Sequence, residues 1–205
     1  ISRANTNSSY ISQLFTLNFM KIVKKIDELE NALKPIKSTN KSIGLVLTMG
    51  NIHKGHLSLV DRAFSENNFI VVTIFINPTQ FNNKDDYKLY PKTLAKDVEK
   101  LHSANCHLLY LPDVNSIYPK GLIKEKTVTK YRDILCDKYR PGHFDGVTTV
   151  VDRFFELIKP NRSYFGEKDY QQLQFVKELV KIKEHNINII PCSSIRDETG
   201  MSYAS

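Results

Sequence analysis

Short apolar runs that alternate with helical spacing constrain the fold of this chain most strongly. The runs IGLVLT, FIVVTIFI, HLLYL, RSYFG and INIIP are rich in β-branched or aromatic side chains, as buried strands are. The segments between them, such as HLSLVDRAFSEN and DYQQLQFVKELVKIKEH, place apolar residues three and four positions apart, as helices do. The alternation predicts an α/β fold, a parallel sheet with helices on both faces.

The two ends of this pattern are less regular. A helix that starts at Lys21 and ends at Pro35 is predicted by the apolar spacing of KIVKKIDELENALKPI. Residues 1–19 are polar and poor in core-forming side chains, and we interpret them as an extension separate from a domain of residues 20–205. Residues 118–140 have the weakest periodicity and are expected to form an excursion from the sheet.

The composition limits the partners. The net charge of +7 allows a nucleic-acid ligand, but the lysines are interleaved with acids and no aromatic–basic stacking module accompanies them. No run approaches the roughly 20 apolar residues that span a bilayer. Cys106, Cys136 and Cys192 suggest neither a disulfide framework nor a paired metal site. We predict a reduced, cytoplasmic protein without nucleic-acid or membrane partners, whose basic charge suits a small anionic substrate.

Polar clusters follow three of the predicted strands. TMGNIHKGH follows the first buried strand, NPTQF follows the second, and FGEKDYQQ follows a later one. Ligands of parallel α/β sheets gather beyond the carboxyl ends of the strands. We therefore expect the three clusters to meet in one binding site.

The first cluster is compatible with a phosphate site. Gly50 and Gly55 allow the backbone to approach a ligand, and a helix that begins near His56 exposes its first N–H groups. His53 and His56 can then donate to phosphate oxygens as charge develops. Two alternatives stay open. A metal site would need further ligands at a supporting spacing, and a core role conflicts with the Gly, Lys and Asn neighbours.

The other clusters supply a cation, a carboxylate and amides. Lys168 suits a phosphate as a mobile point charge, and Asp169 can accept from a ribose hydroxyl or help to hold a cation. The alternative for this pair is an ordinary exposed ion pair. Asn77, Gln80 and Gln172 offer donors and acceptors for a small hydroxylated acid, unless each only caps or solvates a loop.

The stretch RPGHF holds two further candidates. Arg140 can clamp an anionic substrate, although we favour a structural role for it. His143 is expected to pack against, or cap, the helix that follows.

Four stretches together resemble the pantothenate synthetase (pantoate–β-alanine ligase) family. They are TMGNIHKGHLSLV, IFINPTQFNNKDDYKLYPKTLAKDVEKL, YRPGHFDGVTTVV and PNRSYFGEKDYQQLQFVKELV, and the likeness runs from about Met20 to the end. The resemblance implies the Rossmann-like fold of the H-x-G-H nucleotidyltransferase superfamily. It also implies ATP- and Mg²⁺-dependent chemistry in two steps. Pantoate attacks the α-phosphorus of ATP to give pantoyl adenylate and pyrophosphate, and β-alanine then displaces AMP.

The resemblance also implies roles for individual residues. His53, His56 and Lys168 would be catalytic, acting at the phosphates of ATP. Gln80, Asn77 and Gln172 would bind pantoate or β-alanine. No protein metal ligand is assigned, and the family's usual homodimer is expected. The residues implied for the ATP site are Met49, Gly50, Asn51, Ile52, His53, Lys54, Gly55, His56, Gly166, Glu167, Lys168, Asp169, Ile195, Tyr203, Ala204 and Ser205.

The chain departs from the family pattern in three places. Leu47 replaces the usual proline, and GMSYAS puts Tyr203 and Ala204 where the family has an apolar residue and a serine. The family's next arginine and its small C-terminal domain do not follow Ser205. From this we expect the chain to ligate weakly. The alternatives are another H-x-G-H nucleotidyltransferase and an inactive binding or dimerisation domain.

Overall fold

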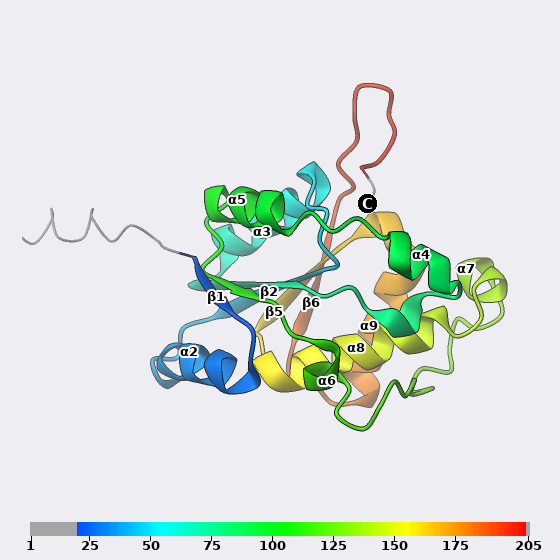
Figure 1. The fold of residues 1–205 in the computed structure, drawn as a ribbon, viewed down its shortest axis with the longest axis horizontal. Helices are drawn as coiled ribbons and strands as arrows, with labels where there is room; N and C mark the ends of the chain where they lie inside the picture. Colours follow the sequence, from blue (N-terminus) through cyan, green and yellow to red (C-terminus); the bar gives the residue numbers. More distant parts are fainter. Residues whose placement is uncertain (1–19, 204–205) are drawn as a thin grey trace, which may run out of the picture.

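The computed structural model describes residues 20–203, which fold around a six-stranded, all-parallel sheet with the order β1–β4–β3–β2–β5–β6 (Figure 1). The strands are β1 (Lys21–Val23), β2 (Ile43–Thr48), β3 (Phe69–Ile74), β4 (Leu108–Tyr110), β5 (Arg162–Gly166) and β6 (Asn188–Cys192). The longer helices are α2 (Ile26–Ser38), α3 (Lys54–Glu66), α5 (Leu94–Ser103), α8 (His143–Ile158) and α9 (Tyr170–Ile182). The short ones are η1 (Pro78–Gln80), α4 (Lys84–Leu89), α6 (Val114–Ile117), α7 (Leu135–Tyr139) and η2 (Glu167–Asp169). The expected extension of residues 1–19 and the candidates Ala204 and Ser205 lie outside the described residues.

Helices cover both faces of the sheet, which confirms the predicted architecture. α3 and α5 pack on one face, where Val60 and Leu101 join an apolar cluster with the strands. α2, α8 and α9 pack on the other face, where Leu33, Phe155 and Leu179 belong to a second cluster. Figure 1 shows α3 and α5 above the sheet, with α2 and α8 below it. The two clusters are the two halves of the core.

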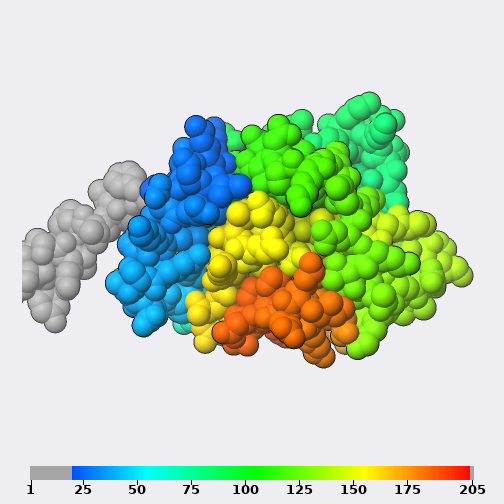
Figure 2. Space-filling view, turned by 90° about the horizontal axis from the view of Figure 1, so that it is seen from below, coloured from blue at the N-terminus to red at the C-terminus, as the bar shows by residue number. Residues whose placement is uncertain are grey.

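α8 lies in the middle of the second layer, between α2 and α9 (Figure 2). Its side chains Phe154 and Phe155 are almost fully buried, and burial of such a side chain stabilises the fold by roughly 1.5–3 kcal/mol. The helix starts after Gly142, whose φ of 73° lies in the left-handed region. Because α8 is packed into the core along its length, its first turn is held rigidly at the edge of the sheet where the predicted site residues lie.

The predicted helix at the start of the domain was wrong in both bounds. Lys21–Val23 form the edge strand β1, which pairs in parallel with β4. α2 starts only at Ile26 and contains Pro35 in its last turn. Only three residues make up β1, which is too short for a clear period, and its partners lie over 80 positions along the chain. The loss of one backbone donor near a helix end costs less than the same loss in the middle.

The other predicted strands and helices are confirmed within a few residues at their ends. Residues 118–140, all of them described, contain only the short helix α7, which fits the predicted excursion. None of the helices within residues 20–203 is long and apolar enough to cross a membrane.

Candidate active site

A cleft of about 410 Å³ opens at the carboxyl ends of the central strands β3, β2 and β5. Its lining includes residues from all three predicted strand-end clusters, such as His56 after β2, Gln80 after β3 and Lys168 after β5. The chain runs outward from β2 in both directions, through β3 and β4 on one side and through β5 and β6 on the other. This reversal leaves a crevice in which ligands of such sheets bind. The expectation that the clusters meet is confirmed.

The turn between β2 and α3 places two histidines in this cleft. The ring of His53 caps α3, because its Nδ1 accepts the backbone N–H of Gly55 at 3.1 Å. The remaining proton of the neutral ring is therefore on Nε2, which is left as a donor. A Cβ at position 55 would lie 2.9 Å from the His53 ring, so the ring can cap the helix only over a glycine. Gly55 is needed here because it lets the His53 ring approach the backbone closely.

The histidine rings lie against one another. The centroids of His53 and His56 are 4.0 Å apart and their planes differ by 24°. Burial, and next the nearby His53, lower the pKa of His56 to about 4. Burial, followed by the charge of Lys168, also lowers the pKa of His53. At neutral pH both rings are uncharged N–H donors. The buried Nδ1 of His56 has no partner among the described residues.

A buried carboxylate holds the backbone of this turn. Asp97 on α5 is 1% exposed and accepts the N–H groups of Asn51 at 3.0 Å and Ile52 at 2.7 Å. Gly50 and Asn51 both have positive φ values, 89° and 51°. Lys100, one turn further along α5, donates to the carbonyl of Ile52. Neither α5 residue was predicted from the sequence, because the groups of the β2–α3 turn that they bind lie more than 40 positions away and no local motif marks them.

Gln80 is held from two sides. Its amide Oε1 accepts from Asn77 at 3.1 Å, and its Nε2 lies 3.1 Å from the sulfur of Met49. Its backbone carbonyl accepts from Nδ1 of His143 at 2.7 Å. Asn77 is 1% exposed and its amide is fully engaged within the protein. Gln80 is thus the amide of NPTQF that has a free edge toward the cleft.

β5 and the first turn of α9 supply the opposite wall. Lys168 and Asp169 are exposed in η2, and Gln172 is half-buried in the first turn of α9. No ion pair between Lys168 and Asp169 is present among the described residues, so the alternative of a simple ion pair is not supported. All three side chains line the cleft.

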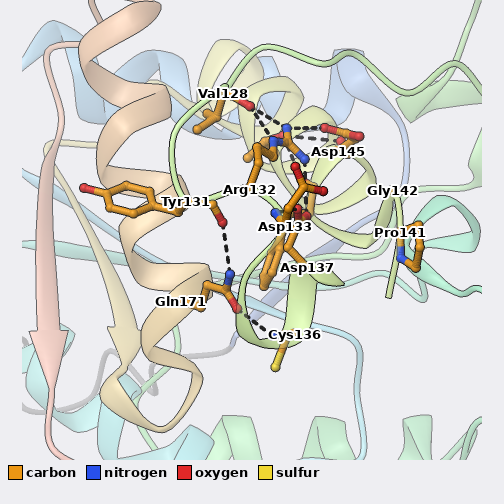
Figure 3. A network of polar contacts seen from close by, with 12 residues as sticks. Val128, Tyr131, Arg132, Asp133, Cys136, Asp137, Pro141, Gly142, Asp145 and Gln171 are labelled. Carbon is orange, nitrogen blue, oxygen red and sulfur yellow. Dashed lines mark hydrogen bonds and ion pairs between the residues drawn. The ribbon is translucent and has the colours of Figure 1, made fainter. Parts of the chain in front are cut away.

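The neighbouring Gln171 does not line the cleft, and it holds the irregular segment, residues 118–140 (Figure 3). Its Nε2 donates to the carbonyls of Tyr131 at 3.1 Å and Ile134 at 2.9 Å. Its Oε1 accepts the backbone N–H of Cys136 at 2.9 Å. The sequence DYQQ therefore contains one glutamine for the cleft and one for the scaffold.

Arg132 completes this scaffold (Figure 3). Its guanidinium group pairs with Asp145 on α8 and with Asp137 on α7, the latter at 3.4 Å. It also donates to the carbonyl of Val128 and lies 4.9 Å from the ring centroid of Phe175 on α9. The segment that leads to the cleft is thereby fixed to α8 and α9.

Residues 193–203 form a protruding hairpin (Figure 1), and Ser193, Ile195 and Tyr203 of this hairpin line the cleft. Arg196 and Ser202 form an isolated antiparallel bridge. The ring of Tyr203 lies 6.1 Å from that of His53, and Nζ of Lys54 lies 5.8 Å from the Tyr203 centroid. Tyr203 extends the pair of histidine rings into a row of three.

The cleft gathers most, but not all, of the candidates. Those that line it are Met49, His53, Gly55, His56, Asn77, Gln80, Gly166, Lys168, Asp169, Gln172, Ile195 and Tyr203. Those that do not line it are Gly50, Asn51, Ile52, Lys54 and Glu167. Arg140 and His143, for which a structural role was favoured, also line it. For His143 the hydrogen bond to Gln80 agrees with the structural role, whereas Arg140 is exposed at the cleft.

A wall of apolar side chains completes the cleft. It comes from the end of β3 and from one face of α8. The residues are Phe75, Val147, Val150, Val151 and Phe154. A small molecule with both an apolar and a polar side fits between this wall and the amides of Gln80 and Gln172.

Comparisons with known proteins agree on one family. Residues 21–205 match the family model described as pantoate-beta-alanine ligase. Pantothenate synthetase of Aquifex aeolicus is 42% identical over 184 residues, which are 90% of this chain and 65% of the relative. That of Thermodesulfovibrio yellowstonii is 44% identical over 172 residues, 84% of this chain and 61% of the relative.

Solved structures give the same result. Pantoate-beta-alanine ligase from Francisella tularensis, complexed with beta-gamma ATP and beta-alanine, superposes with a TM-score of 0.87 at 41% identity. The match covers 90% of this chain and 71% of that one. Pantothenate synthetase from Thermus thermophilus superposes with a TM-score of 0.84 at 39% identity, covering 90% and 66%. This chain spans about two thirds of the length of such relatives, and it belongs to the pantoate–β-alanine ligase family.

Proposed function

We propose that the protein catalyses the ATP-dependent ligation of pantoate and β-alanine to pantothenate. The observation that carries this proposal is the convergence of His53, His56, Gln80, Lys168 and Gln172 on one cleft. In the first step an oxygen of the pantoate carboxylate bonds to the α-phosphorus of ATP, and pyrophosphate leaves. In the second step the amine of β-alanine attacks the acyl carbon of pantoyl adenylate, loses a proton, and AMP leaves.

The triphosphate is assigned to the side of the cleft that carries the histidines. His53 presents Nε2–H, and α3 begins directly behind it with its N-terminal backbone groups. Lys168 adds a positive charge from the other wall. These donors stabilise the charge that develops on phosphate oxygens as the adenylate forms. Ile195 and Tyr203 are assigned to the nucleotide because they line the same cleft.

Pantoate is assigned to the space between the amides and the apolar wall. Its two methyl groups suit Val147, Val150 and Phe154, and its hydroxyl and carboxylate oxygens suit Gln80 and Gln172. In this assignment Asn77 positions Gln80 and does not bind the ligand directly, because its own amide is buried and engaged.

Mg²⁺ is proposed to bind with the nucleotide. Within residues 20–203 no three His, Cys, Asp or Glu side chains are grouped so that they could hold a metal ion. Mg²⁺ commonly binds through one or two carboxylates together with phosphate oxygens. Asp169 is a carboxylate that lines the cleft, so it fits such a site. The ion would supply positive charge for the phosphate oxygens.

Two further statements are proposed at the level of the family. We propose a homodimer, which the exposed apolar residues Ile134, Leu135 and Tyr139 on the irregular segment make reasonable. We also propose a cytoplasmic location, in keeping with three cysteines that form no disulfide among the described residues.

A two-stage assay tests the proposed ligation. The protein is incubated with pantoate, MgATP and pyrophosphatase, and phosphate release and pantoyl adenylate are measured; β-alanine is then added, and pantothenate is measured by mass spectrometry. Phosphate release with other acids but not with pantoate would identify a different H-x-G-H nucleotidyltransferase. ATP binding measured by calorimetry, without phosphate release with any acid, would identify an inactive binding module.

A further inference from the structure

Two amides and a buried tyrosine form a chain of hydrogen bonds that ends at the cleft. Tyr118 directly follows α6, in the irregular part of the sequence, and its hydroxyl donates to Oδ1 of Asn77 at 2.6 Å. Nδ2 of Asn77 donates to Oε1 of Gln80 at 3.1 Å. Gln80 then faces Met49 and the cleft. No sequence motif connects Tyr118 with a ligand, since it lies 41 positions from Asn77.

The orientation of the Asn77 amide is determined by its neighbours. Its Oδ1 lies 3.3 Å from the backbone N–H of Thr79 and 2.6 Å from the hydroxyl of Tyr118. Its Nδ2 lies 3.1 Å from the backbone carbonyl of Gly146 on α8. A rotation of the amide by 180° would place NH₂ against an N–H donor and oxygen against a carbonyl. Both contacts would be lost at a buried site, which is costly.

The close approach of α8 makes this arrangement possible. A Cβ at position 146 would lie 2.5 Å from the carbonyl oxygen of Thr79, so the helix can touch η1 only with a glycine there. Asn77, Thr79 and Tyr118 are all nearly inaccessible to solvent, at 1%, 5% and 7% exposed. Removal of one member therefore leaves its partner away from bulk solvent.

The hydroxyl of Tyr118 is a dependable donor. Burial raises its pKa to about 12, so it keeps its proton throughout the physiological range. The hydroxyl of Thr79 lies 2.9 Å from it and 3.0 Å from Oδ1 of Asn77. The oxygen of Asn77 thus faces donors alone, and its NH₂ group is directed to the two acceptors, Gly146 and Gln80.

This orientation determines what Gln80 offers to a ligand. Because Oε1 of Gln80 accepts from Asn77, its NH₂ group is left for the cleft, where it meets the weak acceptor sulfur of Met49. A ligand oxygen is a better acceptor than a thioether. Gln80 is therefore set to donate to an acceptor oxygen of the substrate and not to accept from an ammonium group.

We propose that Tyr118 is a positioning residue for the acid substrate, which sets the amide of Asn77 and, through it, directs the NH₂ group of Gln80 to a substrate oxygen. The inference rests on the proposed function, because it takes pantoate as that substrate. Tyr118 does not line the cleft, so it acts only through the two amides.

The first test needs no ligand. In the Tyr118→Phe variant, which loses only the hydroxyl, the side-chain NH₂ resonances of both Asn77 and Gln80 are expected to shift in ¹⁵N–¹H NMR spectra. Tyr110→Phe is the matched control, because Tyr110 is also buried and its hydroxyl has no partner among residues 20–203. It is expected to leave both resonances in place. An unmoved Gln80 resonance in a folded Tyr118→Phe protein would overturn the inference.

The second test measures pantoate affinity by calorimetry, with a non-hydrolysable ATP analogue present. Tyr118→Phe is expected to weaken binding about fivefold, the value of one net hydrogen bond. The effect should vanish in a Gln80→Ala background, because Tyr118 acts through Gln80. Additive effects would overturn the inference and indicate a general loss of stability.

A second variant tests the same chain of hydrogen bonds at its middle member, Asn77. Asn77→Asp has the same shape but only acceptor oxygens, so the Gln80 amide is expected to rotate and present Oε1 to the cleft. Pantoate should then bind more weakly than in Tyr118→Phe, and unchanged pantoate affinity would contradict the inference. A wild-type protein that binds no pantoate would refute the proposed function, while the ligand-free resonances would still decide the role of Tyr118.

Discussion

The imidazole rings of His53 and His56 lie nearly parallel, with their centroids 4.0 Å apart. Burial is the main cause that lowers the pKa of both rings; His53 adds to it for His56, and Lys168 adds to it for His53, so the pair stays neutral in the absence of a ligand. In the proposed function, a triphosphate supplies acceptor oxygens to these two neutral N–H donors. The histidine pair is therefore suited to bind phosphate more strongly as charge develops on it.

Replacement of His56 is expected to slow adenylate formation. His56→Ala removes a donor used mainly in the transition state, and such a loss typically lowers the rate about a hundredfold or more. The measurement is pyrophosphate release with saturating pantoate and ATP. Pantoate affinity should change much less than the rate, because the pantoate site is assigned to Gln80 and Gln172.

His102→Ala is the control for this experiment. His102 is exposed on α5 and does not line the cleft, so the rate should stay at the wild-type value. An equal rate in His56→Ala and the wild type would refute the assignment of His56.

The histidine pair should also make stability depend on pH. The native pKa of His56 is about 4, below the value of 6.5 that is usual for histidine, so between these pH values the unfolded chain binds a proton that the native state does not. Stability is then full above about pH 6.5 and is lost as the pH falls toward 4, by up to roughly 1.4 kcal/mol per pH unit. Urea unfolding of wild type and His56→Gln at pH 7 and pH 5 measures the difference.

The wild type is expected to lose more stability between these pH values than His56→Gln does. His102→Gln provides the comparison, since this histidine is exposed, and it should behave as the wild type. If wild type and His56→Gln lost the same amount, the burial of a neutral His56 would be contradicted.

A third prediction concerns the turn that carries the histidines. Asp97→Asn replaces one carboxylate oxygen by an NH₂ group that faces a backbone N–H, either that of Asn51 or that of Ile52. A buried donor without a partner costs about 1–3 kcal/mol. Thermal unfolding should show this loss, and pyrophosphate release should slow because His53 follows the turn directly. Asp61→Asn, on the exposed face of α3, should change neither quantity, and equal melting temperatures of all three proteins would refute the role of Asp97.

Local patterns were sufficient for much of the fold and for the residues at the strand ends. The runs that became β2 and β3 are apolar throughout, so their periodicity was clear, and the sites that follow them carry recognisable polar residues. β1 was missed because its three residues, which pair with β4, are too few to show the alternation of apolar and polar side chains by which a strand is recognised. Asp97 and Tyr118 were missed for a related reason, since each acts on residues more than 40 positions away. Such contacts exist only once the chain has folded.

The glutamine pair shows the same limit within two adjacent positions. Gln171 and Gln172 are chemically identical, and only Gln172 was predicted from the sequence to have a role. In the structure the helix turns one of them toward the cleft and the other toward the irregular segment. Which glutamine does which follows from the rotation of α9, and that rotation is fixed by packing of its apolar face against α8.

The last prediction separates these two glutamines. Gln171→Ala removes three hydrogen bonds to the backbone of the irregular segment, at Tyr131, Ile134 and Cys136. The freed groups lie on an exposed stretch where water can replace the lost partners, so global stability should fall by only about 1–2 kcal/mol. The local effect should be larger, because these bonds fasten the segment to α9. Hydrogen exchange at the Cys136 amide is expected to accelerate at least about tenfold, while exchange in β2 follows the global change alone.

Gln174→Ala is the matched control, since Gln174 lies on the same helix, is half-buried and has no hydrogen-bond partner among residues 20–203. It should leave exchange at Cys136 unchanged. Gln172→Ala should do the same, yet it should weaken pantoate binding, because its amide belongs to the cleft and not to the scaffold. If Gln172→Ala loosened the segment while Gln171→Ala did not, the division of roles between the two side chains would be reversed. The rotation of α9 in the protein would then differ from the one described, since adjacent side chains of a helix project about 100° apart and point in different directions.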